Sequence, residues 1–212
     1  VDNGITVQSA TPAVDGRSVT LAVSQLKEDV SYTLQVRGIR DRAVPPNAMG
    51  AETRVPFNYI HVGNGLRAEY YEGKDFTGPL IGERIDPYIE VDWRRRLPFE
   101  KMTFGVPYSV RWSGRLKADF AEEYMITFFR GWEHNRNPAR VWIDGTLLAN
   151  ESYGPVALEA GRVYDIRAEL NIVKPAEYAD YYRLQWSSLS TPYQTIPQMN
   201  LGAPRKARAA GE

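Results

Sequence analysis

The segment from residue 108 to residue 120 alternates apolar and polar side chains, and this pattern constrains the fold more than any other feature. One parity holds Tyr108, Val110, Trp112, Leu116, Ala118 and Phe120, and the other holds Ser109, Arg111, Ser113, Arg115, Lys117 and Asp119. Because successive side chains of a β-strand point to opposite faces, the segment is predicted to be a long strand with one buried face and one solvated face. Gly114 falls on the apolar parity and predicts a bend or bulge.

The same alternation recurs in four shorter segments: 19–23, 32–36, 164–170 and 182–186. Asp15-Gly16 and Asp144-Gly145 are typical of hairpin turns, because glycine accepts positive φ without a Cβ clash. No segment keeps a helical period over three turns. These patterns predict an all-β chain with the fold of an antiparallel β-sandwich.

The composition excludes several functional classes. The chain has 26 basic and 26 acidic residues, and nucleic-acid binding normally needs a basic field, so nucleic acid is not expected as a partner. There is no cysteine, which excludes disulfides, zinc–thiolate sites and cysteine nucleophiles. No apolar run reaches the roughly 20 residues of a transmembrane helix.

Turn-rich breaks divide the chain. Val44-Pro45-Pro46-Asn47 is one such break, and Gly63-Asn64-Gly65 is a second, after which an aromatic-rich pattern begins. The C-terminal end carries Arg205, Lys206 and Arg208 without apolar periodicity. The predicted organisation is a small β domain at 1–55, a linker at 56–63, the sandwich at 64–202 and a flexible basic tail at 203–212.

An ordered set of short motifs covers about two-thirds of the chain. The motifs are GLRAEYY at 65–71, VDW at 91–93, SVRWSG at 109–114, EYMITF at 123–128, ARVWIDG at 139–145, LEAGRVY at 158–164, LQW at 184–186 and IP at 196–197. With them, the chain resembles the family named for the amino-terminal domain of anthrax protective antigen. The resemblance implies a lectin-like β-sandwich of the kind found in bacterial toxins, glycosidases and yeast adhesins.

Residues 1 to about 55 resemble the second half of a bacterial surface-layer-type immunoglobulin-like domain. The motifs are DGRSVTL at 15–21, Leu26, YTL at 32–34 and GIRD at 38–41. This resemblance implies opening strands ahead of Val1, supplied either by preceding residues or by a partner.

The loop RGWEHNRNP at 130–138 departs from the resembled family. Glycan-binding members carry adjacent aspartates there, and these hold a calcium ion that grips sugar hydroxyls. Here the only acid is Glu133, flanked by Arg130, His134 and Arg136, and one carboxylate among cations is a poor ligand set for calcium. We therefore expect no calcium-dependent lectin activity, no metal site and no cofactor.

The same loop has the composition of a recognition surface. Its candidate binding residues are Trp132, Glu133, His134, Asn135, Arg136 and Asn137, since Trp and Arg are enriched in interface hot spots and a Trp face stacks on sugars. Tyr178 and Tyr181, expected in the loop before the 182–186 strand, are further candidates. The alternative is that Trp132 caps the sandwich and that both tyrosines pack on their own domain.

Arg94, Arg95 and Arg96 form a short basic run after Trp93. Such a run suits acidic lipid headgroups in peripheral membrane contact, an acidic glycan or an acidic protein face. The alternative is a solvated strand end whose charges are screened by salt.

Two histidines in distant segments, His61 and His134, leave little for a Ser–His–Asp triad or a multi-histidine metal site. No phosphate-binding loop or nucleophile elbow is present, so catalysis is not expected. The first hypothesis is a non-catalytic accessory or structural module of an extracytoplasmic assembly, periplasmic, cell-surface or secreted, that binds a protein through loops and an exposed sheet edge. The second is a calcium-independent carbohydrate-binding module that stacks sugars on Trp132, Tyr178 or Tyr181.

Overall fold

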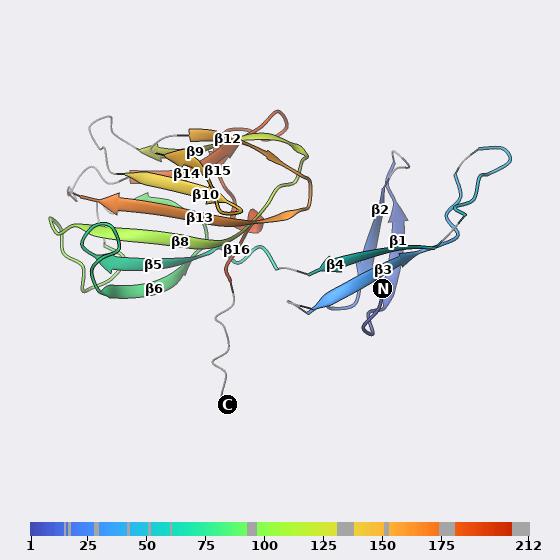
Figure 1. The fold of residues 1–212 in the computed structure, drawn as a ribbon, viewed down its shortest axis with the longest axis horizontal. Helices are drawn as coiled ribbons and strands as arrows, with labels where there is room; N and C mark the ends of the chain where they lie inside the picture. The colour runs from blue at the N-terminus through green and yellow to red at the C-terminus, as the bar shows by residue number, and fades with distance from the viewer. Residues whose placement is uncertain are drawn as a thin grey trace. The chain divides into compact units, whose positions relative to one another are not determined.

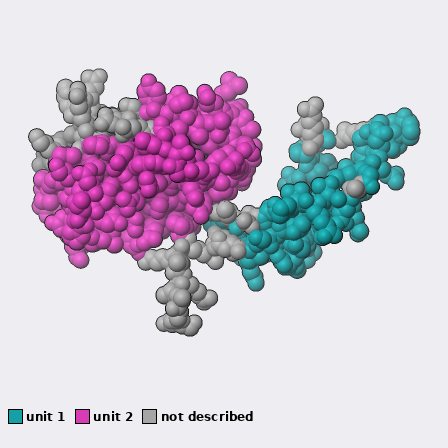
Figure 2. Space-filling view, viewed as in Figure 1, with its two compact units in different colours: residues 1–61 teal, residues 62–212 magenta. Residues whose placement is uncertain are grey.

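The prediction of an all-β, antiparallel fold is confirmed by the computed structural model (Figure 1). The chain divides into two compact units, residues 1–61 and 62–212 (Figure 2). Within the described residues, no helix has the length and apolar character needed to cross a bilayer. The structure describes residues 1–14, 16, 18–27, 30–41, 43–50, 52–59, 61–92, 97–130, 138–150, 153–173 and 181–204.

The larger unit is a sandwich of two sheets. The seven-stranded sheet has the order β11-β10-β13-β8-β5-β6, with β16 also paired to β8. Its strands are β5 (Leu66–Glu72), β6 (Leu80–Asp86), β8 (Tyr108–Lys117), β10 (Ala139–Ile143), β11 (Thr146–Asn150), β13 (Val163–Ile172) and β16 (Leu201–Gly202).

The five-stranded sheet has the order β12-β9-β14-β15, with β7 also paired to β14. Its strands are β7 (Glu90–Asp92), β9 (Glu122–Arg130), β12 (Tyr153–Leu158), β14 (Tyr181–Ser187) and β15 (Gln194–Thr195). One turn of 3-10 helix, η1 (Gln198–Asn200), precedes β16. Because neighbouring strands are antiparallel throughout both sheets, each strand has one face toward the other sheet and one face away from it.

The core lies between the two sheets and consists of the inward parity of each strand. Trp112 of β8 approaches Phe128 of β9, with ring centroids 6.4 Å apart, and Tyr124 lies 5.0 Å from Trp186 of β14. All four rings are buried. Full burial of a large apolar side chain contributes about 1.5–3 kcal/mol, so these aromatic rows hold the sheets together.

The prediction of a bend or bulge at Gly114 was wrong. The register of β8 with β13 is unbroken there, with Gly114 opposite Ile166. A Cβ atom at this position would lie 2.3 Å from the carbonyl oxygen of Gly202 and 2.6 Å from a methyl group of Leu66. Gly114 therefore allows the chain after η1 to approach the inner face of β8.

Two other sequence predictions concern the end of β8 and the turn after β10. The strand predicted to reach Phe120 ends at Lys117, and the Phe120 side chain is exposed in a bend. The hairpin predicted at Asp144-Gly145 joins β10 to β11, and both residues have positive φ, 46° and 77°. Two successive positive φ values are the signature of a type I′ turn, which explains the Asp-Gly pair.

The smaller unit holds two separate two-stranded sheets. Their strands are β1 (Val7–Pro12), β2 (Val19–Val23), β3 (Ser31–Val36) and β4 (Thr53–Asn58), paired β1–β2 and β3–β4. β4 ends at Asn58, so the first part of the range predicted as a linker, 56–63, belongs to a strand. The resemblance to an immunoglobulin-like domain stays a prediction.

The smaller unit has little core. Every side chain of β1 is exposed, and Tyr32 is the one buried apolar side chain among the described residues of 1–61. The Tyr32 ring stacks on Phe57 at 5.6 Å, and its hydroxyl accepts a hydrogen bond from the Lys27 amide at 2.8 Å. On the free side of β3, the Thr33 amide donates to the Asp2 carboxylate at 2.7 Å, and this hydrogen bond lowers the pKa of Asp2.

Candidate functional site

Most sequence-predicted binding residues lie outside the residues that the structure describes. They are Trp132, Glu133, His134, Asn135, Arg136, Asn137 and Tyr178 of the loop patch, and Arg94, Arg95 and Arg96 of the basic run. The strand ends that border these ranges are described, however. Asp92 pairs with Tyr181, and Tyr182 pairs with Arg130, so the ends of β7 and β9 lie beside the start of β14.

The other sheet ends in the same region. β13 ends at Ile172, which pairs with Tyr108 at the start of β8, and β9 and β13 run toward the same end of the sandwich (Figure 1). The three ranges that hold the predicted binding residues, 93–96, 131–137 and 174–180, are therefore all bordered by strands at this end. Distant segments of the sequence converge there because the sheets are antiparallel.

Tyr181 is described, and it lies in a strand and not in the loop where it was predicted. It is the first residue of β14 and is half-buried on the outer face of the five-stranded sheet. Its hydroxyl donates to Glu90 Oε1 at 3.2 Å, the same oxygen that accepts from Arg183 Nη2 at 3.0 Å. The Arg183 guanidinium lies 4.5 Å from the centre of the Tyr181 ring.

Further apolar side chains share this outer face. Phe129 lies edge-on to Tyr181, with centroids 6.2 Å apart, and Tyr153 at the edge of the sheet is 67% exposed. Pairing of Tyr153 with Thr127, and of Phe129 with Arg183, places these rings on adjacent strands. We call Met125, Phe129, Tyr153 and Tyr181 the aromatic face.

Three residues of the aromatic face, Met125, Phe129 and Tyr153, were not predicted from the sequence. The signal was present in β9, where Tyr124, Ile126 and Phe128 face the core while Met125 and Phe129 occupy the other parity. A strand with apolar side chains on both parities indicates two buried faces or one face that contacts a partner. Met125 and Phe129 are both exposed, so this second parity of β9 leaves apolar surface open on the outer face of the sheet.

Gln185 adds a polar group to the same side of β14. It is 6% exposed, and its Oε1 atom has no hydrogen-bond partner within the described residues. A buried acceptor without a partner is costly unless water or a ligand donates to it.

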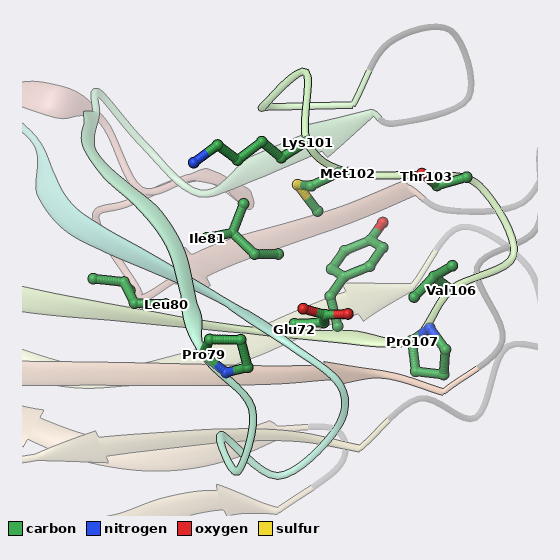
Figure 3. A pocket seen from close by; sticks show the side chains of 10 residues that line it. Glu72, Pro79, Leu80, Ile81, Lys101, Met102, Thr103, Val106 and Pro107 are labelled. Atoms are coloured by element: carbon green, nitrogen blue, oxygen red, sulfur yellow. The ribbon is translucent and has the colours of Figure 1, made fainter.

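A half-open cavity of about 340 Å³ lies between the start of β6 and the segment 101–107 (Figure 3). Its lining is mostly apolar, with one carboxylate and one ammonium group: Glu72, Pro79, Leu80, Ile81, Lys101, Met102, Thr103, Val106, Pro107 and Tyr108. Glu72 and Lys101 are the charged residues of this lining. Across the ranges that the structure describes, no group of three or more His, Asp or Glu side chains is placed to hold a metal.

Asp86 is the centre of a buried polar network. Its Oδ2 atom accepts hydrogen bonds from Trp112 Nε1 at 2.8 Å and from the Tyr70 hydroxyl at 3.0 Å, and its Oδ1 atom accepts from Arg84 Nε at 2.6 Å. Burial, with a smaller contribution from the Asp86 charge, raises the pKa of Tyr70 well above its ordinary value. Because both carboxylate oxygens accept hydrogen bonds, the network holds the end of β6 to β5 and β8.

Residues 63–200 match the model of the PA14 domain. The chain belongs to the PA14 domain family. The match runs from the turn before β5 to the end of η1 and so includes both sheets. The resemblance to the amino-terminal domain of protective antigen is thereby confirmed for the sandwich.

Relatives of this PA14 chain are much longer proteins. It is 36% identical to anti-sigma-I factor RsgI3 of Acetivibrio thermocellus over 147 residues, which are 66% of this chain and 21% of that protein. It is 26% identical to protective antigen of Bacillus anthracis over 148 residues, 66% of this chain and 18% of that protein. The chain therefore spans about a fifth of the length of these relatives.

One solved structure is similar to this chain in both fold and sequence. It is an anti-sigma factor domain-containing protein from Clostridium clariflavum, with a TM-score of 0.60 and 29% identity. The alignment covers 70% of this chain and 49% of that one.

Proposed function

We propose that this chain is a non-catalytic interaction module of an extracytoplasmic assembly, and that it binds a protein partner through its loops and an exposed sheet edge. The resemblance of the sandwich to toxins, glycosidases and adhesins supports a location outside the cytoplasm. Because function in such folds resides in loops and edges, the PA14 match by itself leaves the partner open.

The observation that carries the proposal is the exposure of β1 and β2. An isolated two-stranded sheet is at best marginally stable in water, and β1 is exposed along its whole length. Val7 and Val19, on adjacent strands, leave apolar surface uncovered. A strand added from a partner would pair with the free backbone groups of the ribbon and cover these side chains.

The test is capture of a partner from the native source, followed by mass spectrometry, with a substitution that blocks the ribbon. Val19→Lys places a charge on the exposed apolar row of β2 and should abolish capture, since charges on an edge oppose strand addition. Leu189→Lys is the matched control, because Leu189 is almost fully exposed in a turn of the sandwich. A chain that stays monomeric, captures no protein and nevertheless shows slow amide exchange along β1 would contradict the proposal.

The aromatic face favours a second candidate function, calcium-independent carbohydrate binding. Tyr153 and Phe129 offer exposed rings to the apolar faces of sugars. Binding on a glycan array that resists a calcium chelator and disappears in Tyr153→Ala would support this function. Phe104→Ala, an exposed aromatic of the 97–107 segment, is the control and should bind normally.

A further inference from the structure

Three arginines converge on one carboxylate on the outer face of the seven-stranded sheet. Glu169 of β13 pairs directly with Arg140 of β10 on one side and with Arg111 of β8 on the other. Arg111 Nε donates to Glu169 Oε1 at 2.9 Å, and Arg140 Nη2 donates to Oε2 at 3.0 Å. Arg167, on the same face of β13, lies 3.8 Å from Oε1. We call these four residues the arginine surface.

Aromatic rings and a fixed turn hold the guanidinium groups in place. The Arg167 guanidinium lies 3.9 Å from the centre of the Trp142 ring, and that of Arg111 lies 4.4 Å from the centre of Phe76. Phe76 is itself anchored, because its amide donates to Ser109 Oγ at 3.0 Å. A cation over an aromatic face is attracted to it, so these contacts restrict the positions of the guanidinium groups before any ligand arrives.

The charge of the arginine surface is unbalanced. Three guanidinium groups surround one carboxylate, and the Glu169 side chain is only 7% exposed while that of Arg167 is 48% exposed. Arg111 and Arg140 already satisfy both Glu169 oxygens. Arg167 makes no hydrogen bond to any described residue, and its half-exposed guanidinium lies beside the two other arginines. Two further carboxylates share this face, but Glu69 pairs with Arg67 and Asp165 pairs with Arg115. The positive excess of the arginine surface is therefore on the outside, where an anion can reach it.

We propose that the arginine surface binds the carboxylate side chains of an acidic segment of a partner protein. A guanidinium group can bind a carboxylate through two parallel N–H donors. Three neighbouring guanidinium groups in restricted positions therefore suit closely spaced Asp or Glu side chains. An acidic polysaccharide fits less well, because the rings of Trp142 and Phe76 already carry guanidinium groups and are not free to stack on sugars. This surface is separate from the β1–β2 ribbon and from the aromatic face, so the inference does not depend on either proposal above.

The experiment measures binding of a short fluorescent polyglutamate to the full chain by anisotropy at low salt. Arg167→Gln should weaken binding about tenfold, because it removes a half-exposed guanidinium while the two hydrogen bonds to Glu169 remain. Arg162→Gln is the matched control. Arg162 has a similar exposure and directly precedes β13, five residues from Arg167 in the sequence. If Arg167→Gln lowers the thermal midpoint, Arg140→Gln replaces it in the comparison.

The expected result is polyglutamate binding that weakens with salt, falls in Arg167→Gln and is unchanged in Arg162→Gln. Equal losses in both variants would show a general charge effect and would overturn the proposal, as would absence of binding. The same titration with polygalacturonate separates the two kinds of acidic polymer. Tighter binding of polygalacturonate than of polyglutamate, lost in Arg167→Gln, would assign the surface to a polysaccharide and overturn the protein assignment.

Discussion

At the scale of single residues, close backbone packing accounts for Gly114. Addition of a Cβ atom would bring it to 2.3 Å from the Gly202 carbonyl oxygen, and a backbone atom in a paired strand cannot move as a flexible side chain does. Overpacking of this kind costs about 1–3 kcal/mol. We therefore expect Gly114→Ala to lower the free energy of unfolding by that amount in urea titration.

Leu189→Ala is the control for this prediction, because Leu189 lies in the same unit as Gly114 and its side chain is almost fully exposed. It should leave stability unchanged within error. A neutral Gly114→Ala would mean that β16 shifts freely away from β8, which would contradict the close approach described above.

Asp86 provides a second prediction at the residue scale. Asp86→Ala leaves the Tyr70 hydroxyl and Trp112 Nε1 without their acceptor inside the core. An unsatisfied buried donor costs about 1–3 kcal/mol, so the expected loss of unfolding free energy is roughly 2–5 kcal/mol. Asp165→Ala, which removes an exposed ion pair with Arg115, should cost less than about 1 kcal/mol. Similar losses in the two variants would show that the Asp86 network adds nothing to stability.

At the scale of elements, β8 and β1 differ in how far their side chains are buried. β8 has neighbours on both sides in the seven-stranded sheet, and its inner face is fully buried, whereas β1 has one neighbour and only exposed side chains. Amide exchange in the absence of a partner should therefore be slower in β8 than in β1 by about a thousandfold or more, because β8 opens only when the whole sandwich unfolds. Hydrogen–deuterium exchange with mass spectrometry measures this ratio, and equal protection in both strands would contradict the assignment of β1 as an uncovered edge.

At the scale of the whole molecule, the two units differ in how many apolar side chains they bury. Both sheets of the PA14 sandwich contribute buried aromatic rows, while the described part of 1–61 buries one apolar side chain. In residues 1–61, burial of so few side chains does not offset the loss of conformational entropy on folding. The sandwich has an extensive core, so we expect residues 62–212 to unfold cooperatively when expressed alone.

Residues 1–61 alone should lack a cooperative transition in thermal or urea unfolding followed by circular dichroism. The full chain should show the transition of the sandwich, with little added by the smaller unit. A sharp, independent transition of the isolated 1–61 segment would show that the β1–β2 and β3–β4 sheets suffice without a partner.

The alternation of residues determined much of the fold. It identified β8, β13, β14, β2 and β3, and it placed Trp112 and Trp186 in the core, because a strand has a period of two wherever it lies. The Asp144-Gly145 turn was also predictable, since its positive φ values are a local requirement. The family motifs added the sandwich architecture but not the chemistry of its surface.

Only the tertiary structure decided which residues of the strands are buried in charge clusters or lie against another backbone segment. Glu169 is on the polar parity and was expected in solvent, yet it is buried because arginines from strands 29 and 58 residues away converge on it. Gly114 and Asp86 likewise take their roles from Gly202, Tyr70 and Trp112. Periodicity depends on local backbone geometry and can be read from neighbouring residues, whereas charge clusters and close approaches depend on which strands pair, and that order is set by the folded sheets.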